Sequence, residues 1–132
     1  MPKIGLTDKY NSKLKGTGPI KHHLGCNFFR DKLGVLCFSP KKYINKMING
    51  YQTMFGHKPK TNVSSPLEKG DHPELDNSEL LDEDGVAKYQ SLTGSLQWSI
   101  SQGRLDIQTY AMLMSPFRAA PRKGHLERVK RI

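Results

Sequence analysis

The sequence contains no run of about 18 apolar residues, which argues against a membrane-spanning helix. It also has no apolar secretory stretch near its first methionine, so no secretion signal is evident. Only two cysteines occur, Cys26 and Cys37, and we interpret them as reduced thiols. We therefore expect an intracellular protein, in a cytoplasmic particle or the nucleus, that is not secreted and has no membrane partner.

Acidic residues are scarce outside one segment. Residues 1–60 hold twelve Lys/Arg against two Asp/Glu, residues 61–87 hold one against eight, and residues 88–132 hold eight against two. The net charge of +9 therefore understates the charge of the two basic blocks. Such a charge predicts a polyanionic partner, with nucleic acid the first candidate and an acidic membrane surface the second.

The first third of the chain predicts a β-hairpin. Two short apolar runs within residues 22–38 flank residues 31–34 (DKLG), which have the composition of a turn. Upstream, residues 16–19 (GTGP) are typical of a turn rather than a phosphate-binding loop, because one G-x-G before proline is a weak signal. Five side chains of the hairpin are candidates for burial: Phe28, Phe29, Val35, Leu36 and Phe38.

Helical periodicity replaces strand periodicity after Ser39. Ser39 is the expected N-cap of the first helix, with Pro40 at its first position and Gly56 at its end. Residues 57–85 form an acidic connector with three prolines, which we expect to be flexible. The predicted fold class is α+β, an N-terminal β-hairpin followed by a small helical bundle. Its helices are expected at residues 40–55, 86–102 and 105–115, with part of a fourth from about residue 123 to Ile132.

The helix expected at residues 86–102 carries the most informative pattern. Gln90, Gly94 and Trp98 are spaced by four residues, which places them on one stripe. Glycine costs roughly 1 kcal/mol relative to alanine in a helix interior, so Gly94 indicates close approach of another surface. We interpret this stripe as lying along a nucleic-acid groove; the alternative is a helix–helix contact with Trp98 in the core. The opposite stripe is predicted to face the core and contains Val86, Tyr89, Leu92, Leu96 and Ile100.

Two other groups of residues allow alternative readings. A zinc site could involve His22, His23, Cys26 and Cys37, but their spacing matches no common zinc finger, and strand alternation would separate the two histidines. We favour the cysteines as small hydrophobic residues and predict no metal site. Lysines of the first basic block are candidates for phosphate contact, with a solubilising surface as the alternative: Lys9, Lys13, Lys15, Lys21, Lys41, Lys42 and Lys46.

Six segments in sequence order resemble the reverse transcriptases of copia-type LTR retrotransposons. They are the hairpin, SPKKYI, VSSPLEKG, YQSLTGSLQW, RLDIQTYAMLMSPF and HLERVKRI, and the resemblance covers about residues 13–132. It implies that residues 1–38 are the end of the palm and the primer-grip hairpin. It further implies that residues 39–132 form a thumb-like helical region that includes the connector 57–85.

The resemblance also implies roles for single residues. His23-Leu24-Gly25 matches the family's F-L-G at the start of the primer grip, with histidine for phenylalanine, and residues 104–107 (RLDI) resemble the family's R-P-D-I. The 90/94/98 stripe is similar to the pattern that retroviral polymerases lay along the minor groove of the template–primer duplex. With two lysines from the charge argument, the predicted nucleic-acid-binding residues are His23, Leu24, Gly25, Lys41, Lys42, Gln90, Gly94 and Trp98.

Polymerase chemistry in this family requires carboxylates that hold two Mg²⁺ ions, including a tyrosine-x-aspartate-aspartate turn. In the family this turn lies upstream of the hairpin. The acidic run at residues 82–84 belongs to the connector and is interpreted as solvated. No serine stands in a G-x-S-x-G pattern either. We therefore predict no catalytic residue and no cofactor in this chain. None of the tyrosines begins the required pattern: Tyr10, Tyr43, Tyr51, Tyr89 and Tyr110.

Two functional hypotheses result. The first is a fragment of an RNA-directed DNA polymerase that grips an RNA–DNA or DNA duplex but lacks the catalytic aspartates, with the rest of a retrotransposon polymerase as its partner. The helical pattern that is still running at Ile132 favours a piece of something longer. The alternative is a non-catalytic basic nucleic-acid-binding module, or a non-functional retroelement relic whose charge binds RNA non-specifically.

Overall fold

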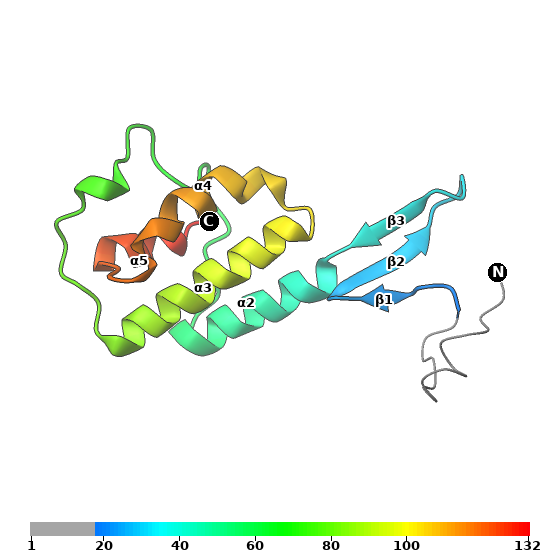
Figure 1. The fold of residues 1–132 in the computed structure, drawn as a ribbon, viewed down its shortest axis with the longest axis horizontal. Helices are drawn as coiled ribbons and strands as arrows, with labels where there is room; N and C mark the ends of the chain where they lie inside the picture. The colour runs from blue at the N-terminus through cyan, green and yellow to red at the C-terminus, as the bar shows by residue number, and fades with distance from the viewer. Residues whose placement is uncertain (1–17) are drawn as a thin grey trace, which may run out of the picture. The chain divides into compact units, whose positions relative to one another are not determined.

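The computed structural model describes residues 18–132, which divide into two compact units between Ser39 and Pro40 (Figure 1). Strands make up the first unit and helices the second, so the predicted α+β class is confirmed. No helix within residues 18–132 is long and apolar enough to cross a membrane. Three of the lysines predicted to contact phosphate, Lys9, Lys13 and Lys15, lie outside the described residues. The first half of the turn predicted at residues 16–19 also lies outside them.

The first unit is an antiparallel sheet with strand order β1-β2-β3. The sequence predicts two strands, and the third arises because Leu24 and Gly25 form a two-residue turn. Their φ angles of 49° and 86° are both positive, as a type I′ hairpin turn requires. This turn brings His23 opposite Cys26. The strands are β1 (His22–His23), β2 (Cys26–Arg30) and β3 (Leu36–Ser39).

The connection between β2 and β3 is the turn predicted at residues 31–34. One carboxylate oxygen of Asp31 accepts hydrogen bonds from the backbone N–H groups of Leu33 and Val35, both at 2.9 Å. Gly34 has a φ of 81°, a conformation that glycine adopts without a steric cost. The residues of the turn therefore specify its geometry, as the sequence indicates.

Burial of the hairpin's apolar side chains was predicted, and most of that prediction is wrong. Phe28 is half-buried and packs against Phe38, with ring centroids 6.2 Å apart. Three short strands expose two faces, and the described part of this unit has no second layer to cover either face. The remaining candidates are each more than half exposed: Phe29, Val35, Leu36 and Phe38.

Within the described residues, the second unit contains four α-helices and three short 3-10 helices. Helices α2 and α3 lie side by side and run in opposite directions (Figure 1). Across this contact the hydroxyl of Tyr43 donates to the carbonyl of Ser95 at 3.0 Å. The α-helices are α2 (Lys41–Phe55), α3 (Glu83–Ser101), α4 (Gln108–Met114) and α5 (Lys123–Val129), and the 3-10 helices are η1 (Pro73–Leu75), η2 (Leu105–Ile107) and η3 (Ser115–Arg118).

The acidic run at residues 82–84 is exposed, but it starts α3 instead of ending the connector. The side chain of Asp82 accepts a hydrogen bond from the N–H of Gly85 at 2.8 Å and is the N-cap. Glu83 and Asp84 occupy the first turn, where the helix dipole favours negative charge. The helix therefore begins ahead of the predicted residue 86.

The start of α2 also differs from the prediction. Pro40 occupies the N-cap position without a side-chain hydrogen bond, and Ser39 remains in β3. The predicted end is correct, because Gly56 has a φ of 73° and its N–H bonds to the carbonyl of Gln52.

The segment predicted as one helix at residues 105–115 is η2, α4 and η3 in succession. Pro116 has no N–H to donate to an α-helical ladder, so α4 ends at Met114 and the backbone tightens into η3. The last helix, α5, begins at Lys123 as predicted and ends at Val129, before Ile132.

The core forms around Tyr89, which is fully buried and donates its hydroxyl to the carbonyl of Met114 at 2.5 Å. In the predicted core stripe, Leu92 and Leu96 are also buried, while Val86 and Ile100 are half-buried. All four α-helices contribute to this cluster, and η2 adds Ile107. Its buried members are Tyr51, Tyr89, Leu92, Leu96, Ile107, Ala111, Met114, Leu126 and Val129.

An ion-pair cluster ties the acidic connector to α5 and the residues after it. The guanidinium of Arg128 donates to both carboxylate oxygens of Asp71, each at 2.8 Å, and also to the carboxylate of Asp76. We call these contacts of residues 68–79 the acidic clasp. Two more ion pairs belong to it, Arg131 with Glu68 at 2.7 Å and Lys123 with Glu79.

Backbone and histidine contacts reinforce the acidic clasp. The N–H of Lys123 donates to the carbonyl of Glu79 at 2.9 Å, and the N–H of Leu81 donates to the carbonyl of Pro121 at 3.0 Å. His125 is buried against Phe117, with ring centroids 4.0 Å apart, and its Nδ1 atom caps α5 by accepting a hydrogen bond from the N–H of Arg122 at 3.1 Å. The flexibility expected for residues 57–85 stays a prediction, although the clasp fixes residues 68–81 at several points.

Two helical glycines provide a matched test of the acidic clasp. A Cβ at Gly124 would lie 2.0 Å from Oδ2 of Asp76, whereas a Cβ at Gly94 would meet no described atom within 4 Å. Asp76 cannot move aside without leaving Arg128. We expect Gly124→Ala to lower the free energy of unfolding by roughly 1–3 kcal/mol and Gly94→Ala to raise it by up to about 1 kcal/mol. Urea denaturation of both variants measures this, and a stabilised Gly124→Ala would contradict the clasp geometry.

Acid should weaken the fold through the same cluster. Burial alone would raise the pKa of Asp76, but hydrogen bonds from Ser78 and Arg128 outweigh it and lower that pKa from 3.8 to about 2. Because the folded pKa is depressed, the stabilisation is present well above pH 3.8 and is lost as the pH falls towards about 2. A shift of this size corresponds to about 2 kcal/mol.

The measurement is urea unfolding at about pH 6 and about pH 2.5 for the parent chain and for Asp76→Asn. The amide cannot titrate, so the variant should lose less stability on acidification than the parent, although it starts from a lower value. Equal losses in the two proteins would exclude Asp76 as the source of acid sensitivity.

Candidate nucleic-acid interface

The α3 stripe, defined as Gln90, Gly94 and Trp98, is open to solvent. Trp98 is 41% exposed, and Gln90 is exposed as well. Gly94 is half-buried, and an added Cβ there would meet no described atom beyond its own stretch of helix within 4 Å. The alternative that placed Trp98 in the core is therefore wrong. Nothing in the described chain uses the bare backbone at Gly94, which leaves it accessible to another molecule.

Hydrogen bonds to η3 fix one edge of the α3 stripe. The side-chain amide of Gln90 donates to the carbonyl of Arg118 at 3.0 Å. About two turns further along, the amide of Gln97 donates to the hydroxyl of Ser115 at 2.8 Å. These contacts hold both amides in place, so Gln90 presents its oxygen from a fixed position. The sequence gives no sign of this support, because η3 lies about twenty residues downstream.

No carboxylate interrupts the α3 stripe. Between Ala87 and Ser101 the only charged residue is Lys88, which is half-buried and forms an ion pair with Asp84. The exposed surface of this segment is otherwise made of small, amide and aromatic side chains. A polyanion can therefore approach it without meeting like charge.

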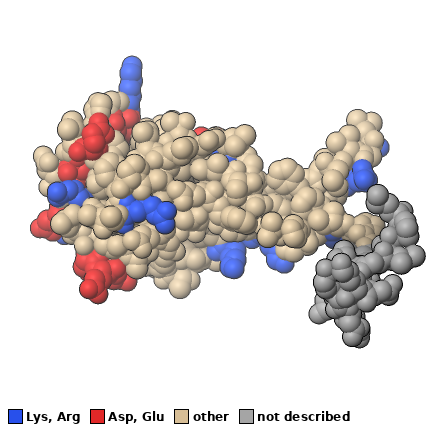
Figure 2. Space-filling model, in the orientation of Figure 1, with Lys and Arg blue, Asp and Glu red and all other residues tan. Residues whose placement is uncertain are grey.

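Exposed cations occur on two elements that contact α3: Lys41, Lys42 and Lys46 on α2, and Arg118 on η3, whose carbonyl accepts the hydrogen bond from Gln90. No Asp or Glu occurs from residue 40 to residue 67. Among the described residues, Lys42 and Lys46 have no ion-pair partner. The Tyr43–Ser95 hydrogen bond places the N-terminal half of α2 along the C-terminal half of α3, which carries Trp98. Figure 2 shows basic side chains projecting from the lower edge of the molecule over α2.

The second basic block, in contrast, is largely neutralised within the fold. Its cations around α5 are engaged by acids or carbonyls, and Figure 2 shows acidic side chains gathered at that end of the helical unit. The net charge of a segment therefore does not show which of its cations can bind an external anion. The partners are Arg122 with the Ser78 carbonyl, Lys123 with Glu79, Arg128 with Asp71 and Asp76, Lys130 with Glu127, and Arg131 with Glu68.

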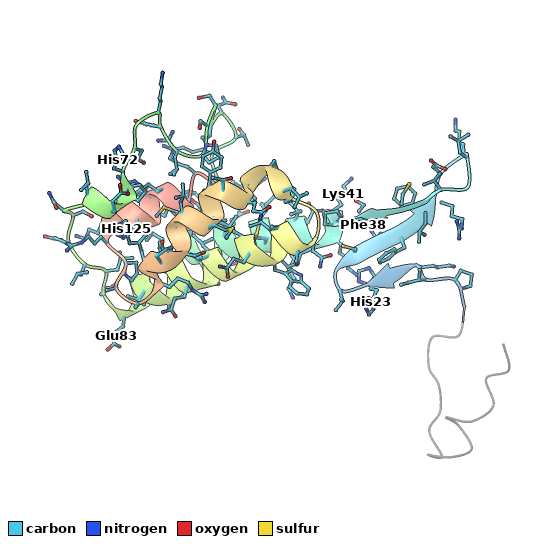
Figure 3. The ribbon with its side chains drawn as sticks, turned by 45° about the horizontal axis from the view of Figure 1, so that its top comes forward. His23, Phe38, Lys41, His72, Glu83 and His125 are labelled. Atoms are coloured by element: carbon cyan, nitrogen blue, oxygen red, sulfur yellow. The ribbon has the colours of Figure 1, made fainter. Side chains whose placement is uncertain are left out.

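The other predicted site residues lie in the sheet unit. His23 ends β1, and Leu24 and Gly25 form the turn into β2 (Figure 3). Leu24 is 59% exposed although it is apolar, and its positive φ is uncommon for a residue with a side chain. Such a conformation costs of order 1 kcal/mol or more and is a feature that functional sites often contain. The sequence resemblance singled out this residue, but propensity alone would not predict it in this turn.

The remaining candidates are the histidines and cysteines of the sheet unit that were considered as zinc ligands. Within residues 18–132, no three His, Cys, Asp or Glu side chains gather as metal ligands would. Cys26 is buried, Cys37 is half-buried, and they form no disulfide with one another. The Nδ1 atom of His22 contacts the side-chain oxygen of Asn27 at 3.0 Å. The statement that this chain contains no metal site and no catalytic residue stays a prediction.

Comparison with known proteins gives one informative match. The chain is 30% identical over 129 residues to "Putative transposon Ty5-1 protein YCL074W" of Saccharomyces cerevisiae. The aligned region is 96% of this chain but 39% of the length of the yeast protein. No family model matches the chain, and no solved structure matches it significantly. This similarity relates the chain to a transposon protein and indicates a retroelement origin.

Proposed function

We propose that the chain is the C-terminal part of a copia-type retrotransposon reverse transcriptase and that it grips a template–primer duplex. The observation that carries this proposal is the α3 stripe, which reaches solvent, contains no carboxylate and belongs to a helix that packs against the lysine-bearing helix α2. The similarity to a transposon protein supports it. The primer-grip role of residues 23–25 rests on the resemblance and on the strained turn at Leu24.

In this proposal α3 lies along the minor groove. An α-helix is about 10–12 Å wide with its side chains, so it fits the wide, shallow minor groove of an A-form duplex better than the roughly 6 Å groove of B-DNA. Gly94 allows the helix backbone to approach, the indole of Trp98 packs on sugars or bases, and the oxygen of Gln90 accepts a hydrogen bond. Lys41, Lys42 and Lys46 contact phosphates across the groove edge.

The chain itself performs no bond-making step in this proposal. In the intact family polymerase, Mg²⁺ ions supply phosphoryl-transfer chemistry, and the carboxylates that hold them belong to a motif missing from this sequence. The role left to these residues is to bind and orient a duplex. Its expected partners are nucleic acid and the rest of a retrotransposon polymerase.

A second candidate is a basic module that binds nucleic acid through charge alone. Lys42 and Lys46, which have no ion-pair partner among the described residues, favour it, since they would produce salt-dependent binding without any groove contact. The two candidates differ in one respect. Groove binding needs Trp98 and Gly94, whereas charge-driven binding does not.

Two substitutions in the α3 stripe separate these candidates. Trp98→Ala should weaken binding to an RNA–DNA duplex by roughly 1–3 kcal/mol, because it removes stacking area without changing charge. Gly94→Leu should weaken binding by blocking close approach, yet it should keep or raise the melting temperature, because leucine is the better helix former. Fluorescence anisotropy with a labelled duplex and thermal unfolding of the same samples give both quantities.

Gly94→Ala is the control for helix propensity, since it adds stability with the smallest obstruction. For the charge contribution, Lys42→Gln should reduce the slope of log affinity against log salt by about 1, whereas Lys123→Gln should change it little because Glu79 already neutralises that lysine. Unchanged affinity in both stripe variants, with a reduced slope in Lys42→Gln, would leave only the charge-driven module.

A further inference from the structure

A cavity of about 230 Å³, partly open to solvent, lies in the helical unit on the side of α3 away from the α3 stripe. Its walls are apolar side chains from several elements that are distant in sequence. Leu92 and Leu96 of α3 line it, whereas Gln90, Gly94 and Trp98 do not. The cavity is therefore separate from the proposed duplex interface. Further apolar walls come from Ile44 and Ile48 of α2, Ile107 of η2 and Val129 of α5.

The charged side chains around this cavity are all basic, namely those of Lys60, Arg104, Lys130 and Arg131. Tyr51 and the last residue of the sequence, Ile132, line it as well. Three of these cations already have acidic partners outside the cavity: Arg104 with Asp106, Lys130 with Glu127, and Arg131 with Glu68.

Lys60 differs from the other three. Among the described residues it has neither an ion-pair partner nor a hydrogen-bond partner for its side chain. An apolar cavity with one unpaired cation at its edge is complementary to a molecule with an apolar body and a single negative charge.

We propose that this cavity is a binding site for a linear aliphatic monocarboxylate of about eight carbons, with its alkyl chain between α2 and α3 and its carboxylate at Lys60. The volume sets the length of the ligand: 230 Å³ equals about eight times the roughly 30 Å³ that one water occupies in the liquid, and a methylene group is of similar size. The single negative charge of the ligand follows from Lys60, which has no acidic partner among the described residues. Burial of the alkyl chain provides the affinity, at about 0.8 kcal/mol for each methylene group removed from water.

Sodium octanoate is the probe, added to the full chain and followed by backbone amide chemical shifts. We expect saturable binding at one site, with shifts centred on the cavity-lining residues of α2, α3 and α5. Octylamine, which has the same alkyl chain and the opposite charge, should bind at least about fivefold more weakly than octanoate. Ile48→Trp should abolish octanoate binding, because its indole fills the cavity.

Lys60→Glu tests the charge and should weaken octanoate binding by about fivefold or more. Lys58→Glu is the matched control, since it makes the same charge change two residues away without lining the cavity, and its affinity should stay within about twofold of the parent. Both positions are exposed, so neither change should affect folding. Any of three results would overturn the proposal: no saturable octanoate binding, equal binding of octylamine, or equal affinities for the two glutamate variants.

Discussion

The charge distribution of the helical unit depends on the ion pairs of Arg128. The guanidinium of Arg128 binds two carboxylates from the connector, those of Asp71 and Asp76, and the Arg128 side chain is mostly removed from solvent. Removing one partner from such a buried cluster leaves an uncompensated charge, which is far more costly than the net contribution of the pair. The acidic connector is therefore fixed against α5, and Gly124 leaves the space that Asp76 occupies.

This arrangement determines which surface is free to bind an anion. With the cations around α5 already paired, the lysines of α2 and Arg118 of η3 are exposed positive charges on elements that contact α3. One face of α3 packs through Tyr89, while the other face leaves Gly94 and Trp98 in contact with solvent. The same helix thus separates the apolar cavity near Lys60 from the proposed duplex interface.

The features that could be predicted from the sequence are those that local patterns determine. Helical periodicity located α2 and α3, Gly56 marked a helix end, and four-residue spacing placed Gln90, Gly94 and Trp98 on one stripe. Contacts between distant segments could not be predicted, because the clasp joins residues about fifty positions apart and no local pattern encodes that pairing. The third strand was missed because leucine rarely adopts the positive φ found at Leu24.

Trp98 is the only tryptophan in the sequence, so its fluorescence reports directly on the α3 stripe. The measurement is the emission of the full chain during titration with an RNA–DNA duplex, together with acrylamide quenching and anisotropy of the labelled duplex in the same samples. The groove account predicts that Trp98 emission changes and that acrylamide access falls in parallel with the anisotropy increase. Full binding by anisotropy, with Trp98 emission and quenching unchanged, would contradict it.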